Sequence, residues 1–230
     1  SIRAQILTAR DHYRSCFGRD PRGIWLPECA YVEAVEEALQ EANIRWFITD
    51  THGILHATPR PRYGVFAPVY TPGGIAAFGR DLDSARQVWS RHEGYPGDPR
   101  YRELYRDVGF DLDWDYVRPY LPAADKRGFT GIKYYRITGK VGGKGVYDRD
   151  AALQAAAVHA QHFLEARMAQ IRQVAGVLDR PPLVVSPYDA ELFGHWWYEG
   201  PEFLDYFVRK AHYDQTVFAL ITPGEYLKRQ

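Results

Sequence analysis

The sequence has 230 residues, of which 46% are hydrophobic and 25% are charged, a composition typical of a chain that folds around an apolar core. Lys and Arg together number 29, as do Asp and Glu, so the formal net charge is zero and no basic stripe indicates a nucleic-acid partner. No apolar run approaches the ~20 residues of a membrane-spanning helix. The two cysteines, Cys16 and Cys29, lack the spacing of a zinc site or disulfide framework, so we expect a cytoplasmic location without a membrane partner.

The first part of the chain alternates between helix and strand. In chain order, the spacing of apolar side chains predicts a helix over residues 2–17, a strand over 23–26, a helix over 32–42 and a strand over 46–49. Gly18 is a typical residue for the end of the first helix. Glu28 and Asp50 follow the two strands almost directly, so both predicted strands end beside an acid.

The middle of the chain begins with a long segment, residues 52–79, that is rich in Pro, Gly and Tyr. Loops of this length usually have a function, and we expect a lid over a site with two short strands, 65–69 and 75–78. The elements predicted next are a helix over 83–90, a turn cluster over 94–99, a short helix over 101–107 and a strand over 131–137. Residues 139–145 lack the spacing of a phosphate-binding loop and predict a flexible loop.

The last part predicts a long helix over roughly 149–177 that Asp148 caps. The elements predicted after it are a buried strand over 183–186, a helix over 203–211, a strand over 217–221 and a final helix capped by Thr222-Pro223. This alternation predicts an α/β fold with about five core strands, mainly parallel. An eight-stranded barrel needs more chain, so we expect residues 1–230 to form a single, incomplete or distorted barrel portion.

Two clusters of acids and aromatics are candidates for catalysis. In the segment 25–31, Glu28 comes directly after a predicted strand, at the edge of the sheet where parallel α/β folds bind ligands. A glutamate in the first turn of the next helix is an equally good interpretation of that position. In the segment 186–199, Asp189 lies among further acids, His195 and several aromatic side chains. A helix start above an aromatic core is the alternative there, but the density of both residue classes favours a site.

Two such carboxyl groups indicate glycoside chemistry. One carboxylic acid protonates the leaving oxygen, while the other carboxylate attacks the anomeric carbon or activates water. A retaining mechanism needs carboxyl groups about 5–5.5 Å apart, a distance that two acids at equivalent strand ends of one sheet can meet.

A metal site is the main alternative, and its candidate ligands are His52, His92, His195, Asp50 and Asp189. No HxH or HxxxH spacing links them, so we expect no metal. His159 and His162 lie three residues apart on the predicted long helix, and we expect them on a solvated face.

The two clusters resemble motifs of glycoside hydrolase family 57, in particular those of its branching enzymes. Residues 23–31 are similar to the nucleophile motif of the family, and residues 186–197 are similar to its acid/base motif. Further segments that resemble the family occur between them in the same order, at 78–81, 87–90, 94–98 and 131–139. The resemblance therefore covers almost the whole chain.

The resemblance implies a (β/α)7-type barrel and a retaining α-glucan transglycosylase that needs no metal or organic cofactor. Glu28 would be the nucleophile and Asp189 the acid/base, and the enzyme would cleave α-1,4 bonds and form α-1,6 branches. The alternatives are an α-amylase, a 4-α-glucanotransferase or an inactive glucan-binding domain; a metal-dependent deacetylase on a similar barrel is a further one.

The resemblance also implies substrate contacts, and the candidate residues are Tyr63, Arg80, Trp89, Gly97, His195 and Trp196. Tyr63 corresponds either to a loop tyrosine that shields the intermediate from water or to a structural residue. From the chemistry alone, His195 and Lys133 are candidate hydrogen-bond donors to Glu28. The histidine motifs that precede these segments in the family, and its C-terminal helical region, are absent here, so we expect the chain to be an excerpt of the barrel.

Overall fold

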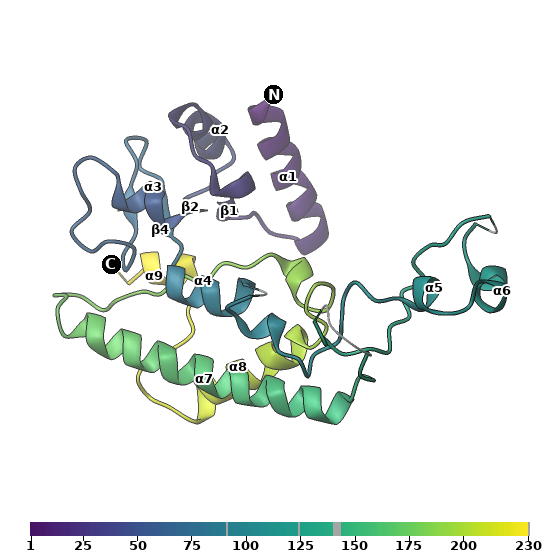
Figure 1. The fold of residues 1–230 in the computed structure, drawn as a ribbon. Helices are drawn as coiled ribbons and strands as arrows, with labels where there is room; N and C mark the ends of the chain where they lie inside the picture. Colours follow the sequence, from purple (N-terminus) through teal and green to yellow (C-terminus); the bar gives the residue numbers. More distant parts are fainter. Residues whose placement is uncertain (91, 124, 140–143, 230) are drawn as a thin grey trace. The chain divides into compact units, whose positions relative to one another are not determined.

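A computed structural model describes residues 1–90, 92–123, 125–139 and 144–229 (Figure 1). The chain divides into two compact units. The sheet unit comprises residues 1–83, 170–187 and 219–230, and the helical unit comprises residues 84–169 and 188–218. Of the predicted loop 139–145, residues 140–143 lie outside the described part of the chain.

The sheet unit contains a four-stranded sheet in the order β1-β2-β4-β3. Its strands are β1 (Gly23–Trp25), β2 (Trp46–Thr49), β3 (Val69–Tyr70) and β4 (Ala76–Gly79). The pairs β1–β2 and β2–β4 are parallel, and only β3 pairs antiparallel with its neighbour. The predicted α/β fold with mainly parallel strands is confirmed.

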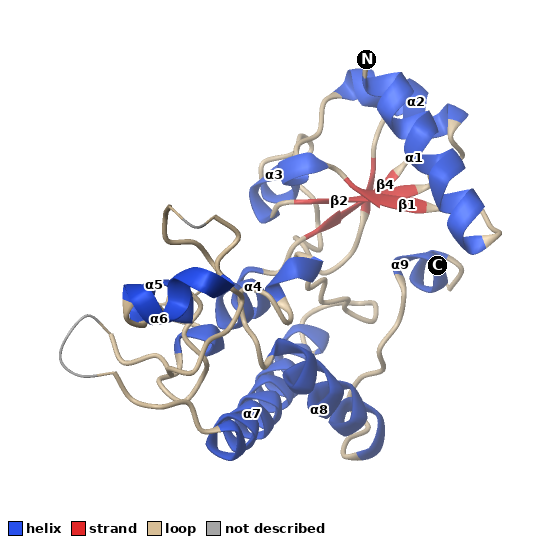
Figure 2. Ribbon diagram, turned by 90° about the vertical axis from the view of Figure 1, so that its right-hand side faces the viewer, coloured by secondary structure: helices blue, strands red, loops and turns tan. Residues whose placement is uncertain are grey.

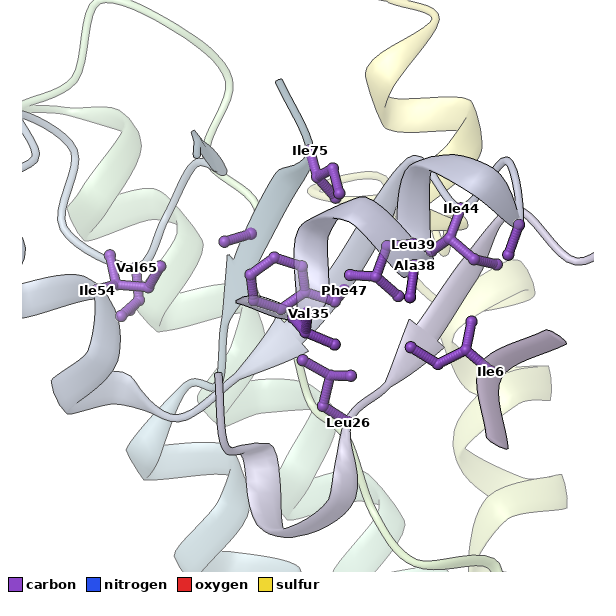
Figure 3. Close-up of a cluster of buried hydrophobic side chains, with 12 residues drawn as sticks. Ile6, Leu26, Val35, Ala38, Leu39, Ile44, Phe47, Ile54, Val65 and Ile75 are labelled. Atoms are coloured by element: carbon purple, nitrogen blue, oxygen red, sulfur yellow. The ribbon is translucent and has the colours of Figure 1, made fainter. Parts of the chain in front are cut away.

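Helices cover the sheet on both faces, as Figure 2 shows for the strands and their neighbouring helices. These helices are α1 (Ile2–Phe17), α2 (Glu36–Glu41), α3 (Thr51–Leu55) and α9 (Pro223–Leu227). Because side chains alternate along a strand, Phe47 and Ala77 pack with α1, α2 and α3 in one hydrophobic cluster (Figure 3). Trp46 and Phe78 belong to a second cluster with Tyr226 of α9. The sheet is thus the middle layer of three.

Close packing beside β1 explains a glycine at the start of that strand. A Cβ atom on Gly23 would lie 2.0 Å from the ring of Trp46, which pairs with Gly23 across the parallel strands. Only glycine leaves room for this indole, so the register of β1 on β2 depends on the pair.

The helical unit is built around one long helix. Its helices are α4 (Leu82–Trp89), α5 (Val108–Asp111), α6 (Trp114–Val117), α7 (Arg149–Ala175) and α8 (Gly200–Tyr213), and the ends of α4 and α7 reach into the sheet unit. A buried stripe of small alanines on α7, which includes Ala152, Ala156 and Ala160, packs in the core with Trp197 and Phe203. The predicted helix and its Asp148 cap are confirmed, because the Asp148 carboxylate accepts from the next backbone N–H groups.

Several short predicted elements are wrong. Residues 101–107 are not helical. Instead, the backbone N–H of Glu103 donates to the carbonyl of Tyr135, and the backbone N–H of Ile137 donates to the carbonyl of Tyr101. The segment 131–137 forms isolated bridges rather than a strand. Residues 183–186 and 217–221 are not assigned as strands, because their backbone hydrogen bonds do not continue as a ladder. Of the predicted strand 65–69, only Val69 lies in a strand. The strand predicted over 75–78 does exist, as the buried inner strand β4.

The remaining local structure consists of 3-10 turns at Pro27–Cys29, Glu33–Val35, Tyr95–Gly97, Arg118–Tyr120 and Ala190–Leu192. The predicted helix over 32–42 therefore begins with a 3-10 turn before α2. Among the described residues, no helix has both the length and the apolar character that a bilayer crossing requires.

Candidate functional site

The nucleophile candidate, Glu28, lies in the tight 3-10 turn that follows β1. Glu28 has φ 52° and ψ 27°, and Cys29 has φ 55°, so two consecutive non-glycine residues adopt the left-handed region. The backbone N–H of Cys29 donates to the carbonyl of Leu26 at 2.9 Å. As a result, the side chain of Glu28 is exposed to solvent while Cys29 is buried.

Residues from three strand ends converge on Cys29. Trp25, the last residue of β1, donates its indole N–H to the Cys29 sulfur at 3.0 Å. Thr49, the last residue of β2, donates its hydroxyl to the Cys29 carbonyl at 3.1 Å. Arg80, which follows β4, points its guanidinium at the same sulfur at 3.4 Å. The parallel sheet thus fixes this turn from its carboxyl edge, where the sequence predicts ligand binding.

Arg80 is held firmly beside the Glu28 turn. Its backbone N–H donates to the Thr49 carbonyl at 3.0 Å, and its own carbonyl accepts from the Thr51 hydroxyl at 2.7 Å. Its guanidinium carbon lies 5.7 Å from the centre of the Trp25 ring, within the range of a cation–π contact. The structure therefore brings together Arg80 and the turn that carries Glu28.

Tyr63 lies in the loop after α3 and contacts the segment that precedes residue 183. Its ring lies 4.6 Å from the guanidinium carbon of Arg180. A hydrogen bond from its hydroxyl lowers the pKa of the Asp179 carboxyl below its usual value. These contacts tie Tyr63 to the segment around Arg180.

The acid/base candidate, Asp189, begins a loop that closes on itself. Asp189 precedes the 3-10 turn Ala190–Leu192, and its side chain is exposed. The Trp197 N–H donates to the Leu192 carbonyl, and the Gly194 N–H donates to the Trp197 carbonyl, each at 2.8 Å. Gly194 has φ 99°, a conformation that favours glycine. Because Leu192 and Trp197 are buried in the core, they fix this loop in the helical unit.

Two indoles of the helical unit are exposed. Trp196 is 44% exposed, and its indole N–H donates to the Glu191 carboxylate at 3.1 Å. The exposed ring of His195 lies edge-on to Trp196, with centroids 5.4 Å apart. Trp89, at the end of α4, is 51% exposed. Both indoles leave ring surface free on which the flat face of a sugar can stack, whereas Trp197 serves the core.

A hollow of about 330 Å³ lies next to Gly97. The residues that line it are His92, Glu93, Gly94, Tyr95, Gly97, Asp98 and His159. Asp98 accepts two hydrogen bonds from the Arg100 guanidinium, and the contact with Arg100 lowers the pKa of its carboxyl despite partial burial. The hollow therefore offers imidazole and carboxylate groups near a predicted substrate contact.

Two predictions about polar side chains are wrong. His162 is exposed as predicted, but His159 is not on a solvated face: its ring stacks on Tyr95 with centroids 4.6 Å apart, and its Nδ1 lies 2.7 Å from the Tyr101 hydroxyl. Burial lowers the pKa of His159. Lys133 is not free to donate to Glu28, because its ammonium group donates to the backbone carbonyls of residues 104 and 106 and lies 3.7 Å from Asp107.

Glu199, the last acid of the 186–199 segment, is only 1% exposed. One of its carboxylate oxygens accepts from the backbone N–H of Arg102 at 3.2 Å. Burial raises the pKa of Glu199, and the nearby Tyr147 hydroxyl and the hydrogen bond from Arg102 offset this only in part. The Glu199 carboxyl is therefore buried and binds the backbone at Arg102.

The predicted site residues belong to different units. Glu28, Tyr63 and Arg80 lie in the sheet unit, and the helical unit contains the others, Trp89, Gly97, Asp189, His195 and Trp196. Among the described residues, no group of three or more His, Cys, Asp or Glu side chains is placed to hold a metal ion. His52 and Asp50, two of the predicted ligands, approach each other only to 3.9 Å.

The sequence did not predict the anchoring role of Cys29 and Thr49. In the sequence, Cys29 indicated only the redox compartment of the protein. Thr49 fits the pattern of the predicted strand and is not otherwise distinguished. Their proximity depends on the pairing of β1 with β2, a long-range contact. The position of both residues at strand ends was the available signal.

Comparisons with known proteins agree with the motifs. The sequence model of the family described as "Glycosyl hydrolase family 57" matches residues 1–230. A 1,4-alpha-glucan branching enzyme of Thermococcus kodakarensis is 33% identical over 89% of this chain and 32% of its own length. The crystal structure of an alpha-amylase, AmyC, from Thermotoga maritima superposes with a TM-score of 0.92 at 42% identity, covering all of this chain and 45% of that one.

A second crystal structure, of a GH57-type branching enzyme from Pyrococcus horikoshii, matches with a TM-score of 0.80 at 31% identity over 99% of this chain and 41% of that one. The chain thus spans less than half the length of these relatives. Its mainly parallel sheet is an incomplete portion of a (β/α)7-type barrel. With the family match over residues 1–230 and these identities, the chain belongs to glycosyl hydrolase family 57.

Proposed function

We propose that the whole protein acts on α-glucans by a retaining mechanism and transfers cleaved α-1,4 chains to form α-1,6 branches. The observation that carries the proposal is the Glu28 turn: an exposed carboxylate in a strained left-handed conformation at the carboxyl edge of a parallel sheet. Strained backbone at such an edge clusters at active sites. The similarity to branching enzymes over most of the chain supports the specific activity.

The proposed reaction assigns one role to each carboxyl group. The Glu28 carboxylate attacks the anomeric carbon as Asp189 protonates the departing glucan oxygen, which breaks the α-1,4 bond and leaves a covalent glycosyl ester on Glu28. The Asp189 carboxylate then removes the proton from the 6-hydroxyl of an acceptor glucan, whose oxygen displaces Glu28. Water in place of the acceptor gives hydrolysis. The residues proposed to contact the glucan are Tyr63, Arg80, Trp89, Gly97, His195 and Trp196.

Replacing either carboxyl group in the whole protein tests these roles. We expect Asp189→Asn to lower turnover by about 10²–10⁴-fold, the range of a lost acid/base group, and Glu28→Gln to lower it at least as far. Glu33→Gln is the matched control, since Glu33 is also exposed and lies only five residues further on. Thermal melting should be unchanged in all three variants. Normal turnover by Glu28→Gln would refute the nucleophile assignment.

The product linkage tests the branching activity. Incubation of the whole protein with linear amylose should give a product that releases short chains on treatment with a debranching enzyme, and its iodine complex should lose colour intensity. A debranching treatment that releases nothing, together with accumulation of reducing ends, would show hydrolysis instead.

An α-amylase is the second candidate, and one observation favours it: the structure with 42% identity and a TM-score of 0.92 is that of an alpha-amylase. A 4-α-glucanotransferase would redistribute α-1,4 chains without adding branches or reducing ends. An inactive glucan-binding domain would still bind amylose after Glu28→Gln and Asp189→Asn but would show no turnover in the native sequence. Chelator-sensitive activity would revive the deacetylase alternative.

We further propose that residues 1–230 form a single barrel portion, that the protein is cytoplasmic, and that it acts without a metal, an organic cofactor or a nucleic-acid partner. Cys16 and Cys29 are both free thiols, which fits a reducing compartment.

A further inference from the structure

The backbone at Glu28 has a conformation that must be enforced by its surroundings. A left-handed backbone conformation is unfavourable for a non-glycine residue, and here two such residues, Glu28 and Cys29, follow each other. Of the described non-glycine residues, only Asn43 also has a positive φ. Such strain persists where the neighbouring structure over-determines the conformation.

The contacts single out the side chain of Cys29. Cys29 is 7% exposed. Its sulfur accepts a hydrogen bond from the indole N–H of Trp25 at 3.0 Å and another from the guanidinium of Arg80 at 3.4 Å. Its carbonyl accepts a hydrogen bond from the Thr49 hydroxyl at 3.1 Å. The residue next to the nucleophile candidate is thus tied by three donors from three strand ends, whereas the Glu28 side chain itself is exposed.

We propose that Cys29 is a positioning residue: its buried sulfur locks the left-handed turn and thereby aims the Glu28 carboxylate. This inference rests on the proposed role of Glu28 as nucleophile. Without the sulfur, the Trp25 indole and the Arg80 guanidinium lose a shared acceptor, and the strained turn loses the contacts that oppose its relaxation. A carboxylate displaced by about 1 Å is enough to cost about 10²-fold in rate.

The same sulfur also orients Arg80. The guanidinium is held between the Cys29 sulfur and the face of the Trp25 ring. Its Nε atom is buried and makes no hydrogen bond within the described structure, so the contacts with the sulfur and the Trp25 ring contribute to the position of the cation. Loss of the sulfur therefore changes the direction of two groups of the proposed site together.

The test uses Cys29→Ala and Cys29→Ser in the whole protein, with α-maltosyl fluoride as the substrate. We expect kcat of Cys29→Ala to fall about 10- to 100-fold with KM within about twofold of the original. Cys29→Ser keeps an acceptor in place and should recover part of kcat. Cys16→Ser, which removes the exposed cysteine of α1, is the matched control and should behave like the unchanged protein.

A merely structural role would give a different result. In that case, Cys29→Ala would lower the melting temperature and the fraction of folded protein, but kcat per folded molecule would stay within about twofold, which overturns the proposal. If Cys29→Ala does not fold, Trp25→Phe provides the second variant, because it keeps a ring and removes only the indole donor to the sulfur. A kcat loss with unchanged KM in Trp25→Phe supports the inference, and unchanged kcat contradicts it.

Failure of the proposed function is recognised separately. Glu28→Ala with added sodium azide should regain turnover of α-maltosyl fluoride and yield β-maltosyl azide, because azide attacks in place of the missing carboxylate as fluoride leaves. Rescue by azide together with a normal Cys29→Ala variant would refute only the positioning role. Full activity of Glu28→Ala without azide would refute the nucleophile and, with it, the inference on Cys29.

Discussion

Glu199 illustrates how a single buried carboxyl group responds to its surroundings. It is 1% exposed, and burial raises its pKa above the ordinary glutamate value. In the unfolded chain this carboxyl ionises near pH 4.3, so the folded state binds the proton more tightly. Stability is therefore greatest below that pH and declines as the pH rises toward the folded-state pKa.

We predict that Glu199→Gln increases stability at neutral pH. The amide keeps an oxygen for the Arg102 N–H and cannot ionise, so the gain is on the order of 1 kcal/mol, the scale of an incompletely paired buried polar group. Denaturant melts at a series of pH values measure it. The gain should vanish below about pH 4; a loss of stability at pH 7 would show that the ionised carboxylate is well satisfied.

At this scale the sequence predicted which residues are special, but not always their partners. Glu28 and Asp189 could be singled out because each follows a hydrophobic run. The donors to the Glu28 turn could not be predicted in this way. Lys133 was an expected donor to Glu28, but its ammonium group binds the carbonyls of residues 104 and 106 instead. Hydrogen-bond partners depend on contacts distant in sequence, such as the approach of Arg80 to Cys29.

At the scale of an element, Asp107 joins the start of α5 to the loop that contains Thr130 and Gly131. It is fully buried, and its carboxylate accepts from the N–H groups of Gly109, Thr130 and Gly131 and from the Thr130 hydroxyl, at 2.8–3.0 Å. Burial alone would raise the pKa of Asp107, but these hydrogen bonds outweigh it and lower the pKa. The ionised form therefore stabilises the fold.

We predict that Asp107→Asn loosens this loop, because the amide NH₂ group would face an N–H donor. The expected cost is about 1.5–3 kcal/mol, that of hydrogen bonds to a charged acceptor. Hydrogen exchange of residues 107–131 and thermal melting measure it. Asp113→Asn is the matched control, since Asp113 is an exposed N-cap of α6 and asparagine caps equally well.

The pH dependence gives an independent check on Asp107. Because its pKa is lowered, its contribution is present above the ordinary aspartate value of about 3.9 and is lost as the pH falls through the folded-state pKa. The difference in stability between the original protein and Asp107→Asn should therefore shrink in acid. A difference that stays constant down to pH 2 would contradict the charged role.

Elements with local determinants could be predicted, and those that depend on pairing could not. The Gly18 end of α1 and the Thr222 cap of α9 were visible in the sequence, and both exist as αL and capping-box conformations. The segment 131–137 has the apolar content of a strand, but it meets its neighbours only at isolated bridges. The strand predicted over 75–78 exists as β4, shifted by one residue, although it lies in a segment rich in Pro and Gly.

For the whole molecule, the parallel sheet explains how a candidate site can be assembled from distant segments. The strands β1, β2 and β4 run in the same direction, so Trp25, Thr49 and Arg80 come together around Cys29. The sequence predicted this edge from the alternation of strands and helices. It did not reveal the division of the chain into two compact units, because segments such as 170–187 join the sheet unit from far along the chain.

The most direct measurement is to trap the proposed glycosyl-enzyme. The Asp189→Asn variant of the whole protein, incubated with α-maltosyl fluoride, should release fluoride without needing an acid but should turn over slowly because the base is missing. Proteolysis and mass spectrometry should then find a maltosyl group on the peptide that contains Glu28, attached to that residue. A maltosyl group on a different residue, or none despite fluoride release, would contradict the account.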